Sequence, residues 1–494
     1  MKKLLEKRTN PLFAVLVAFM LGYFLVNDLD LRYIYVYAVL GIILLVSFFL
    51  DGVIRPGMKL GEIVSGVLQR ITPMKACFLF MVLVVTVYSV LPSSDKDHEV
   101  ISTTISMLLL SVYVLFSAPK ERTVMRVFTA IHAVAVVFSV YIIIVRIHPD
   151  FYWNDVYPHL GSYTQERAAF LMPLGYGVPI GGSTSYGVYV ITIAFFINFV
   201  RMLISGGIQK FREIVLTVAS TVLYLTAILL VNRRSEMLAL IATAAVLFVI
   251  YLVPKGKKEW RIKLQTLGST AVLMVLVVSL LAQAGHLGRH FETIEALKPD
   301  SSTTVVTDPI NPNEMPTSET EAPTIPAPES DAPKSELSHG RFVLWKCGIE
   351  LFLENPVQGV GWMQFRNNSD FGEDYVHNTY IQWLCETGVI GFLLIFTPIM
   401  FMIFMTFKQT LRFARKQDEI SYELRLINKV ALAMNGYFLA LNLVDPTFYH
   451  LYFFVFYSFV IVLADAALGL ESTEYARSDI KCIVKNIWKN TKLF

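Results

Sequence analysis

The stretch HNTYIQWLCETGVIG, residues 377–391, runs from a long polar segment directly into an apolar segment of membrane-spanning length. The apolar segment continues to position 406 without the alternation of apolar and polar side chains that marks a barrel strand, so it indicates a helix. A helix needs about 20 mostly apolar residues to cross a bilayer. This stretch therefore predicts a transmembrane helix with a lone histidine, His377, at its mouth.

The composition assigns the rest of the chain to the same class. Of its 494 residues, 55% are hydrophobic and 16% are charged, and the mean hydropathy is +0.55. A soluble domain of this size could not bury so much apolar surface. We therefore expect an all-α, polytopic membrane protein. The first apolar run has no small-residue cleavage site after it, so we expect it to be retained as a span.

Apolar runs of similar length recur along the chain and predict about 12 transmembrane helices. Helices one to nine belong to residues 1–283, and helices ten to twelve belong to residues 380–469. The expected spans are 11–26, 33–50, 74–91, 101–118, 124–147, 186–204, 214–231, 236–253, 265–283, 380–406, 430–445 and 450–468.

Lysines and arginines in the connecting loops predict the orientation of these helices. With the amino terminus in the cytoplasm, every cytoplasmic loop is rich in positive charge, whereas the opposite loops at 27–30 and 93–99 are neutral to acidic. The basic tail, 470–494, is then cytoplasmic too. The two large polar segments, an outer loop near 148–185 and a larger one at 284–379, are expected outside.

The larger outer loop has two parts of different composition. Residues 299–335 are rich in Pro, Thr, Ser, Glu and Asp and have almost no bulky apolar side chains, which predicts a disordered tether. Residues 339–376 contain apolar side chains at helical spacing, which predicts an amphipathic helix near the membrane surface. A turn at Pro356, Gly359 and Gly361 should end this helix.

The charge and the cysteines exclude other classes of protein. A net charge of +3, spread over many loops, does not predict a nucleic-acid partner. The four cysteines are Cys77, Cys347, Cys385 and Cys482. They show neither CxxC pairing nor metal-ligand spacing, so we expect neither a disulfide scaffold nor a metal site.

Two arginines break the charge rule. Arg233 and Arg234 occupy a tight hairpin on the expected outer side, between two apolar helices, where charges are costly and usually have a partner. One interpretation is a salt bridge to Glu236 or a contact with lipid headgroups. The other is an anion clamp, because a guanidinium binds phosphate or carboxylate oxygens in a bidentate manner.

A third arginine, Arg341, and His377 are expected on the same side as this hairpin. Arginines can stabilise the negative charge that develops on a pyrophosphate leaving group. An imidazole, whose ordinary pKa is about 6.5, can take a proton from an attacking hydroxyl. With Arg234, these residues predict transfer from a pyrophosphate without a metal.

The region from about 340 to 395 resembles the signature region of the O-antigen ligase and O-antigen polymerase family. The matching residues are Arg341 to Trp345, Asn355 to Gly361, His377 with Asn378, and Glu386, Gly388 and Gly391. The similarity extends more weakly to the arginine hairpin and to residues 181–187. Members of this family are bacterial membrane glycosyltransferases that act on glycans linked to undecaprenyl pyrophosphate.

The resemblance implies a role for each main residue. His377 would be the general base, Arg234 and Arg341 would engage the pyrophosphate, and no cofactor would be needed. Arg233 stands where the family usually has a small residue before the hairpin arginine, so either of the two arginines could face the site. The partners implied are an undecaprenyl-pyrophosphate glycan donor, a glycan or lipid acceptor, and membrane lipid.

Several other residues are secondary candidates. They are Asn378, Glu386, Arg167 and Asp445, with His148 and His159. Those in loops are interpreted as loop or interface residues, and Glu386 could cap or orient the tenth helix. Gly388 and Gly391 predict close helix packing. The aromatic residues between 151 and 163 fit an interfacial belt or a sugar-stacking surface equally well.

The resemblance implies a ligase-like glycosyltransferase of the bacterial cytoplasmic membrane, with its active site on the outer face. A polymerase that joins lipid-linked repeat units stays open as an alternative, because only the acceptor differs. A lipid-glycan transporter or flippase is a further alternative, since twelve spans are common among transporters. The chain has no visible repeated halves, however, and its candidate charges lie outside the apolar runs. Nothing in the sequence favours a purely structural role.

Overall fold

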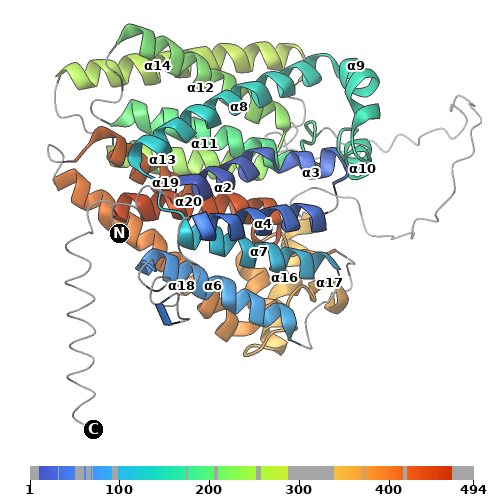
Figure 1. Cartoon of the computed structure of the whole chain (residues 1–494). Coiled ribbons are helices and arrows are strands. Elements are labelled where there is room, and N and C mark those ends of the chain that lie inside the picture. The colour runs from blue at the N-terminus through green and yellow to red at the C-terminus, as the bar shows by residue number, and fades with distance from the viewer. Residues whose placement is uncertain are drawn as a thin grey trace, which may run out of the picture.

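The computed structural model describes residues 10–31, 33–50, 61–62, 68, 71–91, 98–173, 176–204, 208, 210–251, 257–286, 339–369, 371, 373–415 and 420–469. Within these residues the protein is all-helical and has no β-strand, which confirms the expected fold class. The long helices run alongside one another in a single bundle (Figure 1). The expected tether at 299–335 and the basic tail lie outside the described residues.

The helices follow in chain order. They are α2 (Asn10–Gly22), α3 (Phe24–Asp28), α4 (Tyr33–Leu50), α6 (Pro73–Val90), α7 (His98–Phe116), α8 (Glu121–Ile147), α9 (Pro149–Phe151), η1 (Tyr152–Val156), η2 (Tyr157–His159), α10 (Ser162–Leu171), α11 (Thr184–Leu203), α12 (Phe211–Val231), α13 (Arg234–Tyr251), α14 (Lys257–Gln283), α16 (His339–Glu354), α17 (Phe365–Asn368), α18 (Thr379–Arg415), α19 (Tyr422–Leu441), η3 (Thr447–Tyr449) and α20 (Leu451–Gly469).

Seven helices in the described part of the chain are long and apolar enough to cross a membrane, namely α6, α8, α11, α12, α14, α18 and α20. The protein is therefore a multi-pass membrane protein. Helices also occupy the other expected spans, but the first of these is divided, because α2 ends at Gly22 and α3 begins at Phe24. The number of twelve crossings stays a prediction.

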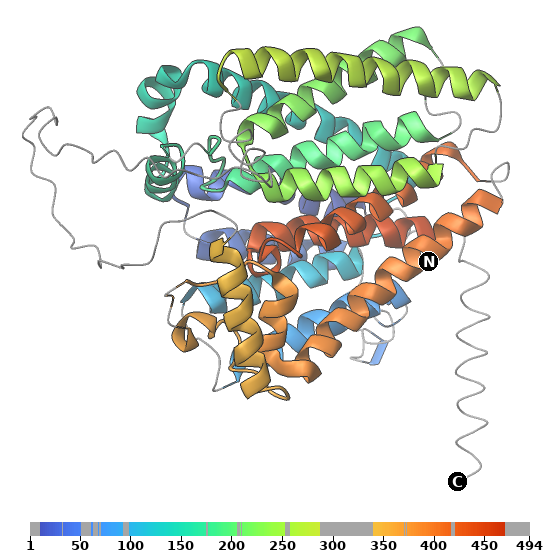
Figure 2. The same ribbon diagram turned by 180° about the vertical axis from the view of Figure 1, so that it is seen from behind.

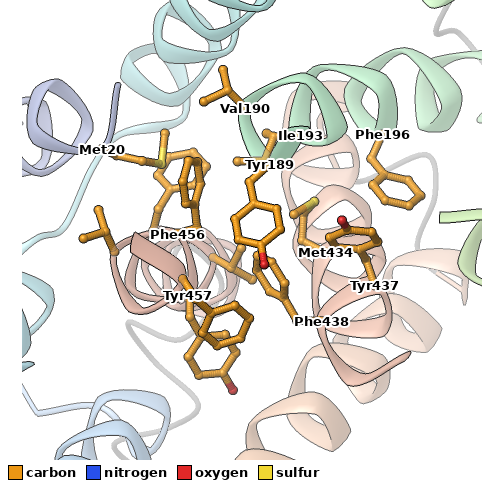
Figure 3. Packing of buried hydrophobic residues seen from close by; sticks show 14 of the residues in the cluster. Met20, Tyr189, Val190, Ile193, Phe196, Met434, Tyr437, Phe438, Phe456 and Tyr457 are labelled. Atoms are coloured by element: carbon orange, nitrogen blue, oxygen red, sulfur yellow. The ribbon is translucent and has the colours of Figure 1, made fainter. Parts of the chain in front are cut away.

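Helices α11 and α20 form the centre of the bundle. In each of them 89% of the apolar stretch is buried within the protein, against 11% in α14. Tyr189 of α11 packs against Tyr437 and Phe438 of α19 and against Phe456 of α20, with ring centroids 5.5 to 6.3 Å apart (Figure 3). This aromatic core fixes the relative positions of three helices whose ends contribute to the site described below.

The shorter segments gather at one end of the bundle. Helices α9 and α10, between α8 and α11, lie at the same end as α16 and α17 (Figures 1 and 2). Tyr152 of this region is fully buried, and its ring packs against Trp153 and Tyr157 at 5.4 and 6.3 Å. These aromatic residues therefore contribute to local packing.

Helix α16 is the helical part of the second large loop, but it is shorter than the expected range of 339–376. It ends at Glu354, before the turn at Pro356, and the chain then continues through turns and the short α17. Leu344 is buried against α18, whereas Phe342 is 63% exposed. The helix therefore has apolar side chains both against the bundle and on its free face.

Helix α18 is interrupted at Gly388, which corrects the interpretation of this glycine as a helix-packing residue. Gly388 has φ +62° and ψ −174°, a conformation that side chains disfavour and that breaks the helical ladder. The loop after α16 fills the break, because the N–H groups of Val360 and Gly361 donate to two carbonyls of α18 at 2.8 and 2.9 Å. Gly391, by contrast, does permit close packing, since an added Cβ would lie 2.7 Å from Tyr88 of α6.

We expect Gly388→Ala to destabilise the protein. A positive φ costs a residue with a Cβ about 1 kcal/mol or more, and the added carbon would lie 2.3 Å from the carbonyl oxygen of Val357. Gly436→Ala in α19 is the matched control, because its Cβ would approach no atom closer than 3.4 Å. Thermal unfolding in detergent should show a lower Tm for Gly388→Ala alone, and equal Tm values would contradict the prediction.

Candidate active site

The hairpin between α12 and α13 places an arginine between two carboxylates. Helix α12 is followed by Asn232 at φ +63°, and α13 begins at Arg234, so the chain reverses within two residues. The Nε of Arg233 lies 3.0 Å from Oε1 of Glu236. Its Nη2 lies 2.7 Å from Oδ2 of Asp445. The salt bridge to Glu236, one of the two interpretations of the sequence, is therefore present.

Both carboxylates are buried and accept further hydrogen bonds. Glu236 is 0% exposed and Asp445 is 7% exposed. Ser185 donates to Glu236 at 2.6 Å, and the hydroxyl of Ser235 lies 2.8 Å from Glu236 and 3.2 Å from Asp445. Burial lowers the pKa of Arg233, but the charges of Glu236 and Asp445 outweigh burial and hold this pKa well above its ordinary value. The guanidinium therefore stays charged and is neutralised by its own neighbours.

Hydrogen bonds join the start of α18 to the connection between α19 and α20. Asn378 caps α18, because its side-chain oxygen accepts from two N–H groups of the first turn at 3.0 and 3.1 Å. Its amide donates to the carbonyl of Leu443 at 2.9 Å. Thr379 donates to the side-chain oxygen of Asn442 at 2.6 Å. These contacts hold the preceding residue, His377, beside this connection.

His377 is a half-buried residue with a left-handed backbone, φ +56°, which is uncommon outside glycine. Burial lowers the pKa of its imidazole. The negative charge of Asp445 opposes this shift and the positive charge of Arg341 adds to it, while Glu373 and Arg233 act more weakly. The net direction is downward. The imidazole is therefore neutral at pH 7 and able to accept a proton.

Arg341 reaches the same place from α16. Its Nη1 donates to the carbonyl oxygen of Val444, the neighbour of Asp445, at 3.1 Å. Arg234, the first residue of α13, is half-buried, and Arg167 on α10 is exposed. The side chains of Arg233, Glu236, Asp445, His377 and Arg341 therefore form one cluster of charged and titratable groups. Arg167 lies at the margin of this cluster.

A second imidazole, that of His450, lies in the cluster and was not recognised in the sequence. Its ring stacks on Tyr452 at 5.2 Å and meets Tyr375 edge to face at 5.5 Å. Burial lowers the pKa of His450 to about 4, although the charge of Asp445 acts in the opposite direction. His450 is the first residue of the last expected span, 450–468, at the end expected on the same side as His377, and this position is the signal that would have found it.

Glu386 is fully buried in the turn of α18 that precedes Gly388, outside this cluster. Its carboxylate accepts from Gln382 at 3.1 Å and from Tyr449 at 2.7 Å. Trp362 stacks on Tyr449 with the ring centroids 4.8 Å apart. Glu386 therefore links α18 to the segment that precedes α20.

The glycines before α11 shape its entry. Gly181 has φ +63° and donates from its N–H to Asp28 at 3.1 Å, and Gly182 has φ +72°. A side chain at Gly182 would collide with a tyrosine ring of α10. The tight path brings Ser185, in the first turn of α11, to Glu236. This explains how the 181–187 segment contributes to the site.

The cluster brings together proton acceptance and positive charge. The imidazole of His377 is neutral. Arg341 donates to an uncharged carbonyl oxygen, so the positive charge of its guanidinium can also attract an anion. Three-residue groups of His, Cys, Asp or Glu arranged to hold a metal are absent from the described residues. Chemically, this arrangement suits the departure of an anionic group together with deprotonation of a hydroxyl.

Part of the chain that contains these residues resembles a known protein family. Residues 219–396 match the model of a protein family described as O-antigen ligase. The match includes the arginine hairpin, Arg341 and His377, whereas Asp445 and His450 lie beyond it. No curated protein matches the chain. The resemblance expected from the sequence is therefore confirmed for this segment, which matches the O-antigen ligase family.

Proposed function

We propose that this protein transfers a glycan from an undecaprenyl-pyrophosphate donor to a hydroxyl acceptor on the outer face of a bacterial cytoplasmic membrane. The observation that carries the proposal is the cluster of His377 and Arg341 around the Arg233–Asp445 pair, whose two members are 212 residues apart in the chain. The family match supports the class of reaction. The donor, the acceptor and the side of the membrane are parts of the proposal.

In the proposed step the acceptor oxygen bonds to the anomeric carbon of the donor sugar. The bond between that carbon and the pyrophosphate oxygen breaks, and its electron pair leaves with the pyrophosphate. The acceptor proton passes to the neutral imidazole of His377. Arg341 and Arg234 stabilise the charge of the leaving group. Atoms and charges balance without a further reactant.

Arg233 has a different role in this proposal. Its charge is neutralised by Glu236 and Asp445 at 3.0 and 2.7 Å, so it positions Asp445 and does not bind the pyrophosphate. Asp445 in turn acts on His377 through its charge. Of the two hairpin arginines, we therefore assign Arg234 to the donor.

Incubation of the purified protein with a lipid-pyrophosphate oligosaccharide and a panel of acceptors tests the proposal. Mass analysis of the products should detect the glycan on an acceptor and free lipid pyrophosphate. Transfer to a different glycan or lipid would identify a ligase, whereas growth of the donor repeat would identify a polymerase. Movement of the lipid-linked glycan across a vesicle membrane without a new glycosidic bond would overturn the proposal.

The transfer rate should fall on the acid side below a pH of about 6.5, because the neutral imidazole of His377 accepts the proton and its pKa lies below the ordinary value of 6.5. Glu373→Gln removes a negative charge that raises this pKa, so the acid limb should move to lower pH. Asp445→Asn should move it further, since Asp445 acts more strongly. Profiles of kcat against pH measure both shifts.

The imidazole of His450 does not explain an acid limb just below pH 6.5, because burial lowers the pKa of His450 to about 4. A limb that stays in place or moves to higher pH in Glu373→Gln would contradict the assignment of His377. Glu373 is exposed, so Glu373→Gln changes the charge near His377 without breaking a buried ion pair. It is therefore the control for Asp445→Asn, which removes the salt bridge to Arg233.

A further inference from the structure

Two tyrosine rings fix the plane of the His450 imidazole. The ring of Tyr452 lies parallel to it, with the centroids 5.2 Å apart and an interplanar angle of 8°. The ring of Tyr375 lies 5.5 Å away at an interplanar angle of 67°. The backbone of His450 is held too, because its N–H donates to the carbonyl of Thr447 at 3.0 Å. The ring nitrogens therefore point in directions that the fold determines.

The ring nitrogens of His450 are available to a ligand. Within the residues that the structure describes, neither nitrogen forms a hydrogen bond with the protein. The side chain is half-buried, so a ligand can reach its edge. Polar groups that are removed from water ordinarily have a partner, and a neutral imidazole offers one N–H donor and one acceptor nitrogen. The edge of this ring is therefore suited to hydrogen bonding with a substrate.

Positive charge reaches this edge from several elements. Arg233 of the hairpin, Arg167 of α10 and His377 all act on the imidazole of His450. The charge of Asp445 acts in the opposite direction, but this carboxylate is already paired with Arg233 at 2.7 Å. Arg167 is exposed and forms no ion pair within the described part of the chain. The balance of these charges attracts an anion to the edge of the ring.

His450 and His377 have different environments, which suit them to different tasks. Burial is the main cause that lowers the pKa of His450 to about 4. At pH 7 the ring is therefore neutral, and its N–H can donate a hydrogen bond without giving up the proton. Two titratable groups in unlike environments commonly divide the roles of one reaction. With His377 as the proton acceptor, His450 is the imidazole that can donate to an anion.

We propose that the imidazole of His450 donates a hydrogen bond to the pyrophosphate oxygen that leaves the anomeric carbon. The proposal rests on the glycosyl transfer proposed above, because it adds a residue to the departure of the leaving group. That oxygen gains negative charge as its bond to carbon breaks, whereas the proton of the hydrogen bond remains on His450. A donor that is fixed in advance stabilises this charge where it develops. His450 lies outside the segment that matches a protein family, residues 219–396, so that match does not assign this role.

Binding of two lipids to the full-length, detergent-purified protein tests the contact without relying on transfer. Undecaprenyl pyrophosphate carries the terminal phosphate whose oxygen leaves the sugar, and undecaprenyl phosphate lacks it. His450→Phe keeps an aromatic ring beside Tyr375 and Tyr452 but removes both nitrogens. Native mass spectrometry should show about 10-fold weaker binding of undecaprenyl pyrophosphate, as expected for loss of a hydrogen bond to a charged group. Binding of undecaprenyl phosphate should not change.

Transfer kinetics distinguish a hydrogen-bond donor from a structural residue. His450→Phe should lower kcat about 10²-fold at saturating donor, the usual effect of removing one such donor. The acid limb of the pH profile should stay in place, because one neutral ring replaces another. His450→Gln keeps an N–H donor and should recover part of kcat. His159→Phe is the matched control, because His159 is an exposed histidine of the other outer loop, and this variant should change neither binding nor kcat.

Failure of the unmodified protein to bind undecaprenyl pyrophosphate, or equal binding by His450→Phe, overturns the proposal. An equal loss of both lipids would indicate a structural role and also overturns it. Displacement of the acid limb in His450→Phe would make this residue a proton acceptor, which is a third contrary result. Selective loss of undecaprenyl pyrophosphate binding, when the unmodified protein performs no transfer, would refute the proposed function and leave the contact standing.

Discussion

Replacement of His377 by glycine should reduce the rate of glycan transfer by about 10²- to 10⁴-fold, the usual contribution of a general base. His377 has φ +56°, which glycine adopts without strain. This variant therefore removes the imidazole and leaves the backbone in place, whereas alanine would add strain to the loss of the base. Initial rates of product formation by mass analysis, at saturating donor and acceptor, measure the effect.

Added imidazole should restore part of the activity of His377→Gly, because it can occupy the vacated space and accept the proton. His377→Asn is a second variant without a base, since asparagine also tolerates a left-handed backbone. Both variants should unfold at nearly the same temperature as the unmodified protein. A rate close to that of the unmodified protein in either variant would exclude His377 as the base and direct attention to His450.

Arg233→Met and Arg234→Met should affect different properties, the stability of the protein in the first case and kcat/KM for the donor in the second. Arg233→Met leaves Glu236 and Asp445 buried without their counter-ion, 0% and 7% exposed. Loss of one partner of a buried ion cluster costs about 3–5 kcal/mol, so this variant should be strongly destabilised. Arg234→Met should instead lower kcat/KM for the donor by about 10- to 100-fold, as expected for loss of a charge-assisted bond to the pyrophosphate. Thermal unfolding and donor kinetics separate the two effects.

The double variant Arg233→Met with Asp445→Asn tests the physical cause of this instability. It removes one of the two uncompensated carboxylates, so it should recover part of the stability that Arg233→Met loses. A stable Arg233→Met protein with a large defect in donor binding would reverse the assignment, because the pyrophosphate would then contact Arg233.

The helices could be predicted from the sequence because their signals are local. Apolar runs located most of the long helices to within a few residues, although α14 and α19 begin eight residues earlier and α18 ends nine residues later than expected. Pro356 marked the end of α16, which stops at Glu354. The proximity of Arg341 and His377 could also be predicted, because both residues belong to the second large loop. Local patterns determine where elements begin and end, and short segments keep their residues near one another.

The rest of the site depends on contacts that no local pattern specifies. Asp445 meets Arg233 across 212 residues, and this contact depends on how α13, α19 and α20 pack. Gly388 was misinterpreted for the same reason, since its positive φ is needed only because the backbone of Val357 lies against it. His450 escaped notice because a single histidine after an apolar run has no distinctive spacing.

The long reach of the Arg233–Asp445 contact also affects biogenesis. While the chain is being synthesised, Arg233 and Glu236 enter the membrane long before Asp445 leaves the ribosome, because 212 residues separate the two ends of the ion pair. The nascent protein therefore passes through most of its insertion with an incomplete ion cluster. A chain that stops before Asp445 cannot form this ion pair, so the ion cluster is complete only after the segment between α19 and α20 has been made.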